Sequence, residues 1–166
     1  MVRVWFLVAV VGLSLACNLS GAEPATGVAP GTQPGITFEV PDGYFVSNEF
    51  EADKAESFVV LRDQKGFDAV FGAGFVMQDK AHRLGADAFA TKMVVAAIKR
   101  GKALWKFKVT EVAAEGKTLT VRYTATAVPS ATAEFSCPLI VALPKGDFAA
   151  VVFEENGKVV RTVEVK

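Results

Sequence analysis

The segment ADAFATKMVVAAIKR, residues 86–100, is the strongest candidate for a long helix in this chain. Its apolar side chains recur at helical spacing. Asp87 lies in the first expected turn, Lys99 and Arg100 lie in the last, and Gly101 follows as a C-terminal cap. We therefore expect one principal helix over 86–100, covered over most of its surface because its polar face is narrow.

Alternating apolar and polar residues around this segment predict β-strands. The expected strands cover residues 36–40, 57–62, 69–77, 109–112, 117–128, 135–143 and 147–154, and the C-terminal KVVRTVEVK. Turn sequences at 115–116, 144–146 and 156–157 predict three hairpins, with Asn156-Gly157 the strongest signal. The predicted fold class is α+β, a mainly antiparallel β-sheet with one principal helix packed on one face.

The N-terminus predicts export from the cytoplasm. Arg3 precedes a 12-residue apolar stretch, Val4 to Leu15, and small residues follow, so residues 1–22 are typical of a secretory signal peptide. The apolar stretch is too short to span a bilayer as a stable helix. Two processing routes remain open, namely cleavage before Glu23 or lipidation of Cys17 after the lipobox-like sequence Leu-Ala-Cys.

Residues 23–35, EPATGVAPGTQPG, are rich in proline and glycine and predict a flexible linker. The remaining residues, 36–166, have the length of a single domain. A flexible linker would connect a lipidated residue in the membrane to the folded domain, so we expect a lipoprotein anchored through Cys17. Its location would be periplasmic or on the outer surface.

Composition excludes several function classes. The chain has 18 basic and 18 acidic side chains, so it has no electrostatic footprint for nucleic acid. One histidine and two distant cysteines exclude zinc-finger spacing and a disulfide scaffold. We interpret His82 as a solvated loop residue and Cys137 as a structural thiol, because neither has an expected catalytic partner. No catalytic residue, metal or cofactor is expected.

Residues 99–108 contain five bases and no acid. The five are Lys99, Arg100, Lys102, Lys106 and Lys108, with Trp105 and Phe107 between them. One interpretation is a patch that binds an anionic partner or surface. The other is a helix end followed by a strand, in which the lysines face water while Trp105 and Phe107 pack under the helix. Substitution of a buried Trp105 by alanine would then destabilise the fold strongly.

The sequence ITFEVPDGYFV at 36–46, the helix-like LGADAFATKMVVAAIKRG at 84–101 and the strands that follow resemble the PsbP-like superfamily, in its bacterial envelope lipoprotein type. The resemblance spans about residues 36–153. It implies a non-catalytic binding or assembly role and carries no catalytic residue. The chain departs from the family at its C-terminus, where KVVRTVEVK replaces the usual helix by a strand.

These observations together predict an exported, lipid-anchored, non-enzymatic envelope module that binds a partner protein or a surface. The alternative is a carrier of a small apolar ligand, with a pocket between helix and sheet lined by Phe89, Met93 and Phe107. A small enzyme is a third hypothesis, which the lack of a nucleophile, base or metal cluster disfavours.

Overall fold

The computed structural model describes residues 35–74 and 82–165. The chain divides into two units, Met1–Gly31 and Thr32–Lys166, and every described residue belongs to the second. The predicted signal peptide, Cys17 and all but the last residue of the predicted linker lie outside the described residues.

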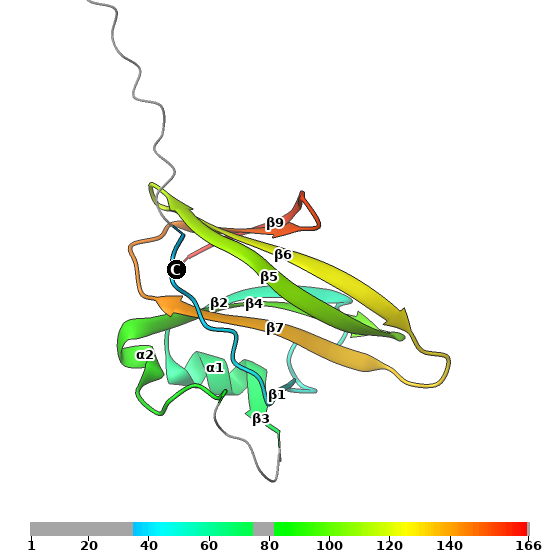
Figure 1. Cartoon of the computed structure of the whole chain (residues 1–166). Coiled ribbons are helices and arrows are strands. Elements are labelled where there is room, and N and C mark those ends of the chain that lie inside the picture. The colour runs from blue at the N-terminus through cyan, green and yellow to red at the C-terminus, as the bar shows by residue number, and fades with distance from the viewer. Residues whose placement is uncertain (1–34, 75–81, 166) are drawn as a thin grey trace, which may run out of the picture. The chain divides into compact units, whose positions relative to one another are not determined.

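Nine strands and two short helices form in the described part of the chain (Figure 1). In chain order they are β1 (Tyr44–Val46), β2 (Glu56–Leu61), α1 (Gln64–Val70), β3 (Phe71–Ala73), α2 (Ala88–Thr91), β4 (Lys92–Gly101), β5 (Ala103–Glu115), β6 (Thr118–Pro129), β7 (Phe135–Pro144), β8 (Ala150–Glu155) and β9 (Lys158–Glu164).

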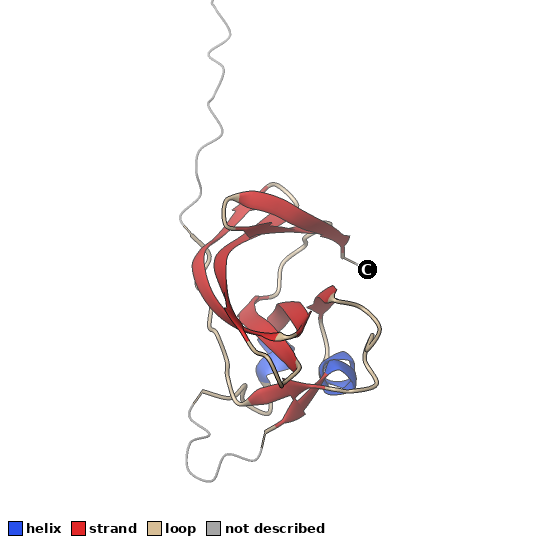
Figure 2. Cartoon of the chain, turned by 90° about the vertical axis from the view of Figure 1, so that its right-hand side faces the viewer, coloured by secondary structure: helices blue, strands red, loops and turns tan. Residues whose placement is uncertain are grey.

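These elements stack in three layers, in which both helices cover one face of a three-stranded sheet and a four-stranded sheet covers the other (Figures 1 and 2). The three-stranded sheet has the order β2-β4-β7 and is antiparallel. The four-stranded sheet has the order β5-β6-β8-β9, and only its β6–β8 pair is parallel. β1 and β3 form a separate antiparallel pair.

The predicted principal helix over 86–100 is wrong, and with it the α+β fold class. Helix α2 takes only four residues, Ala88–Thr91, and the segment continues as strand β4. β4 is the central strand of its sheet, and it is buried on both faces because the helices cover one face and the four-stranded sheet covers the other. Such a strand has a continuous apolar sequence, and periodicity alone does not distinguish that sequence from a buried helix.

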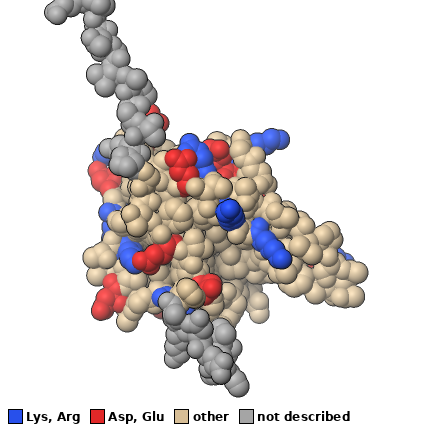
Figure 3. Space-filling model, viewed as in Figure 1, with Lys and Arg blue, Asp and Glu red and all other residues tan. Residues whose placement is uncertain are grey.

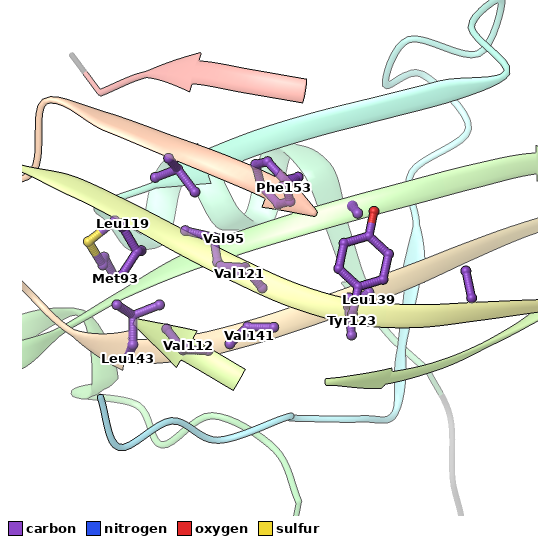
Figure 4. Close-up of a cluster of buried hydrophobic side chains, with 13 residues drawn as sticks. Met93, Val95, Val112, Leu119, Val121, Tyr123, Leu139, Val141, Leu143 and Phe153 are labelled. Carbon is purple, nitrogen blue, oxygen red and sulfur yellow. The ribbon is translucent and has the colours of Figure 1, made fainter. Parts of the chain in front are cut away.

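Alternate residues of β4 enter two different cores. Met93, Val95 and Ala97 pack between the two sheets, and the intervening residues pack against the helices. The β-branched residues Val94 and Val95 favour this conformation because their restricted side chains suit a pleated sheet. Figure 4 shows the core between the sheets, with Met93, Leu119 and Leu143 close together.

Several strand predictions are confirmed. Strand β2 forms, and β5 and β6 form a hairpin around Gly116, as expected. β8 and β9 form a hairpin at Asn156 and Gly157, which have φ angles of 51° and 79°. Positive φ at both positions is what a two-residue hairpin turn of type I′ requires. The C-terminal segment is a strand, β9.

Other strand predictions are wrong. Residues 36–40 make only an isolated bridge at Glu39, and β7 and β8 lie in different sheets instead of forming a hairpin. The expected strand at 69–77 begins as the end of α1 and continues as β3, and its last residues lie outside the described ones. Helix α1 is not among the predicted elements, although Asp63 caps it by accepting the Gly66 N–H at 2.7 Å.

Candidate functional site

A charged cluster lies at one end of the layer between the two sheets. Lys99 continues the Met93, Val95, Ala97 face of β4, so its side chain enters this layer. Only 6% of Lys99 is exposed, which is rare for a lysine. Its Nζ donates to Glu155 Oε1 at 2.7 Å and to Glu56 Oε1 at 2.9 Å.

The cluster keeps Lys99 cationic. Burial by itself would lower the pKa of Lys99, but the hydrogen bonds and charges of Glu155 and Glu56 outweigh it, so the pKa rises above its ordinary value. A lysine that acts as a nucleophile or base needs the neutral amine. The geometry therefore favours a structural or electrostatic role for Lys99 over catalysis.

Trp105 covers the cationic end of Lys99. The Nζ atom lies 4.3 Å from the centre of the indole ring, within the range of a cation–π interaction. The backbone N–H of Trp105 donates to Cys137 Sγ at 3.3 Å, which joins the edges of the two sheets. The expected inward face of β5 is confirmed, since Trp105 and Phe107 pack against the core between the sheets. They do not pack under a helix, as expected, because no helix spans 86–100.

Two polar atoms of the cluster have no partner among the described residues. They are the hydroxyl of Tyr123 and Oε2 of Glu155, both buried. The pKa of Tyr123 rises because of burial and the nearby charge of Glu155, so the phenol stays neutral. Glu155 thus acts on the hydroxyl through its charge, while the Tyr123 hydroxyl and Glu155 Oε2 have no hydrogen-bond partner among the described residues.

A groove of about 270 Å³ opens next to this cluster. Its walls are the segment Val40–Tyr44, the side chains of Trp105 and Phe107 on β5, and residues 138–140 of β7. β5 and β7 are the edge strands of their sheets, so the groove lies at the seam between the two sheets. Val40, on its rim, is 49% exposed.

Pro41 explains why the groove is open. Glu39 and Ala142 exchange two backbone hydrogen bonds, of 2.8 and 2.9 Å, at the free edge of β7. The next pair in this antiparallel register would join Pro41 to Ile140, but proline has no N–H. The ladder stops there, and the N–H and C=O of Ile140 point away from β4 without a backbone partner among the described residues.

The five bases of the predicted patch do not form one surface. Lys99 is buried between the sheets, and Arg100 on the opposite face of β4 donates to Ser57 Oγ and to the carbonyl of Phe50, each at 2.8 Å. Lys102, Lys106 and Lys108 are exposed. Binding of an anionic partner by these three lysines stays a prediction.

The two residues considered for catalysis lie in separate places. His82 is exposed, and its carbonyl accepts the Asp42 N–H at 3.1 Å. Cys137 is buried and free. In residues 35–74 and 82–165, no three His, Cys, Asp or Glu side chains group in a way that could hold a metal ion. Neither helix in those ranges is long and apolar enough to cross a membrane.

The residues expected to line a carrier pocket do not share one. Met93 belongs to the core between the sheets and Phe89 to the core under the helices, whereas Phe107 borders the seam groove. A different hollow, of about 420 Å³, lies beside α1. Its apolar lining comes from Tyr44, Phe67, Phe71 and Leu84.

Sequence reasoning does not identify the Lys99 cluster or the groove. The partners of Lys99 are 43 and 56 residues away along the chain, so only the sheet order brings them together. The one sequence signal for the groove is Pro41, because a proline interrupts the hydrogen bonds between two strands.

No family model matches the chain, and neither a curated protein nor a solved structure matches it. The resemblance to the PsbP-like superfamily thus stays a prediction. The helix over 86–100 on which it partly depended is a strand in this structure.

Proposed function

We propose that this chain is an exported, lipid-anchored, non-enzymatic envelope module that binds a partner protein in the seam groove. The observation that carries the proposal is the apolar seam groove, which has two aromatic side chains and lies at the junction of two edge strands, β5 and β7. Grooves with side-chain pockets beside a sheet edge are a common way to recognise an extended peptide.

The size of the groove supports a polypeptide partner. Pockets that hold drug-sized ligands measure about 300–1,000 Å³, and the groove has about 270 Å³. It therefore suits one or two side chains of a longer partner. Trp105 and Phe107 supply an apolar surface for a side chain of the partner.

The non-enzymatic part of the proposal draws support from Lys99. Its two carboxylate partners raise its pKa and hold it as a cation, which is the wrong state for a nucleophile or general base. Reproducible turnover that disappears on substitution of Lys99, His82 or Cys137 would contradict this part.

The anchor is tested in a bacterium that expresses the chain with its N-terminus intact. Wild type should enter the detergent phase, because bacterial lipoproteins carry several acyl chains, which together hold firmly. The Cys17→Ser variant should move to the soluble phase. A wild-type protein that is already soluble and begins at Glu23 would exclude the anchor.

The groove is tested by site-specific photo-crosslinking in intact cells. A photoreactive residue at Val40, on the rim of the groove, should give one discrete protein adduct. The matched control is Val159 on β9, which is also exposed, at 63%, and does not border the groove. The peptide identified in the adduct should then shift the emission of Trp105 when it is added to the purified protein. Equal adducts from both positions, or no shift, would reject the groove as the binding site.

The hollow beside α1 favours a second candidate, a carrier of a small apolar ligand, because its volume of about 420 Å³ is within the range of ligand pockets. Native mass spectrometry of the purified protein should then reveal a bound compound. Substitution of Leu84 by tryptophan would fill the hollow and remove that compound, while the Val40 crosslink would remain.

A further inference from the structure

One part of the four-stranded sheet projects beyond its neighbours. β8 pairs only with Thr118–Tyr123 of β6, so the rest of β6 has β5 as its one strand neighbour in the described chain. We define the arm as residues 103–108 of β5 paired with residues 124–129 of β6. The Asn156 side chain bonds the N–H and C=O of Ala125, each at 3.2 Å, at the root of the arm.

The outer face of the arm carries lysines, threonines and an exposed apolar pair. The cross-strand pairs on this face are Leu104 with Val128, Lys106 with Thr126, and Lys108 with Thr124. Leu104 is 40% exposed and Val128 is 45% exposed, at the far end of the arm. Lys102 precedes the arm at the same end and is exposed too.

Charge changes sign along this face of the sheet. Beyond the arm, Arg122 lies between Glu111 and Glu154, with ion pairs of 2.6 and 3.0 Å, and is therefore compensated. Lys106 and Lys108 have no ion pair with any described residue. In Figure 3 the part of the molecule that projects to the right has a mostly uncharged surface with a few Lys or Arg side chains.

We propose that the arm docks on an anionic lipid surface. The three lysines would face the lipid headgroups, and Leu104 and Val128 would enter the boundary between headgroups and acyl chains. Apolar side chains beside lysines are the combination that holds proteins at membrane interfaces. The seam groove lies on the inner side of β5, so the outer face of the arm is separate from the proposed peptide site.

The position of the chain's entry agrees with this docking. Ile36 donates its N–H to the carbonyl of Val112 at 2.8 Å, on the same strand as Leu104. Leu104 and Val112 are eight residues apart, or about 26 Å along a strand. The chain from Cys17 to Ile36 is long enough to span about 60 Å when extended. An acylated Cys17 and the arm can therefore reach one bilayer, although the docking itself needs no anchor.

The test uses the lipid-free chain that begins at Glu23 and co-sedimentation with vesicles. Binding should be measurable with phosphatidylglycerol and weak with phosphatidylcholine, and it should fall as salt is added. Since each lysine near such a surface contributes about fivefold, loss of both charges in Lys106→Glu/Lys108→Glu should weaken binding by at least about 25-fold. Leu104→Ser/Val128→Ser should also bind more weakly, with its salt dependence intact.

The matched control is Lys65→Glu/Lys158→Glu, which makes the same change in net charge at exposed lysines on α1 and β9. It should bind like wild type. If both charge variants lose vesicle binding equally, the effect depends on net charge alone and the proposal is wrong. It is also wrong if wild type does not bind phosphatidylglycerol vesicles. The melting temperature of each variant is compared with that of wild type, to show that the variant is folded. If the chain does not bind vesicles and an acidic protein is crosslinked from position 106, the partner of the arm is a protein and the lipid proposal is wrong. The Val40 crosslink reports on the groove alone, so each proposal can fail without the other.

Discussion

The two ends of the layer between the sheets are built on the same face of β4, yet they differ in chemistry. At one end, Met93 packs with Leu119 and Leu143, and all three are at most 1% exposed. At the other end, Lys99 is buried with Glu155 beside the Trp105 ring. Figure 4 shows Tyr123 toward this second end, away from Met93. Hydrophobic burial therefore closes one end of the layer, whereas the other end contains buried polar groups next to the groove and the arm.

The largest effect is expected at the apolar end. Leu119→Ala removes a side chain that is fully buried, and the cavity adds to the lost burial, so the free energy of unfolding should fall by about 4 kcal/mol. Urea unfolding measures it. Val160→Ala is the control, because Val160 is 40% exposed and its loss should cost under about 0.5 kcal/mol. Similar losses in both variants would mean that the apolar end is not packed as described.

The second effect is expected at the polar end. Lys99→Met should lower the free energy of unfolding by about 3 kcal/mol, because Glu155, whose side chain is only 11% exposed, would remain charged without its partner. Adding Glu155→Gln should restore part of the loss, since the uncompensated charge is then removed. If Lys99→Met leaves the free energy of unfolding unchanged, water solvates this end of the layer, and the contrast with the apolar end disappears.

The pH dependence of this difference tests the charge itself. Since the folded-state pKa of Lys99 is raised above the ordinary value of 10.5, its contribution is complete below pH 10.5 and is lost as the pH rises through the folded-state pKa. The gap in stability between wild type and Lys99→Met should therefore be constant from pH 7 to about 9.5. It should narrow at strongly alkaline pH. A gap that is the same across the whole range would assign the effect of the substitution to packing.

Trp105 should contribute less than a fully buried tryptophan. Truncation of a buried aromatic residue costs about 3–5 kcal/mol, but Trp105 is only partly buried, and its ring covers Lys99. We expect Trp105→Ala to lose about 2 kcal/mol, and Lys106→Ala, on the opposite face of β5, to lose almost nothing. Iodide should quench Trp105 emission partially. Full quenching with an unchanged unfolding midpoint would place the ring on the surface.

The sequence is informative where one face of an element is polar. Alternation in β5 predicts that Trp105 and Phe107 point inward, and Asn156-Gly157 predicts the β8–β9 turn, because only residues tolerant of positive φ suit it. Sequence reasoning fails for β4, where residues 93–98 are all apolar because both faces are buried, so no polar stripe marks the period.

The candidate site is beyond sequence reasoning for a different reason. Lys99 and Arg100 are adjacent in a basic run, and their side chains point to opposite faces, one between the sheets and one toward Ser57, because this segment is a strand and not the expected helix. The groove likewise depends on register, since Pro41 opens it only because Glu39 pairs with Ala142. Three of the five predicted patch residues, Lys102, Lys106 and Lys108, are exposed, as the sequence predicts. For Lys106 and Lys108 the alternation along β5 indicates the outward direction, and Lys102 lies between two strands.

The smallest effect, and the finest test of the polar end, is expected for Tyr123→Phe. The substitution keeps the ring, which packs with Phe107 at a centroid distance of 6.1 Å, and removes only the hydroxyl. That hydroxyl is buried without a partner among the described residues, so no direct protein hydrogen bond is lost, and the cost of its desolvation disappears. Stability should be unchanged or rise by up to about 1 kcal/mol in urea unfolding. The matched control is Tyr44→Phe, because the Tyr44 hydroxyl accepts the Leu84 N–H at 3.0 Å and its loss should cost about 1 kcal/mol. A comparable loss in Tyr123→Phe would mean that an ordered water links the hydroxyl to Glu155, and the polar end would then be as fully satisfied as the apolar end is packed.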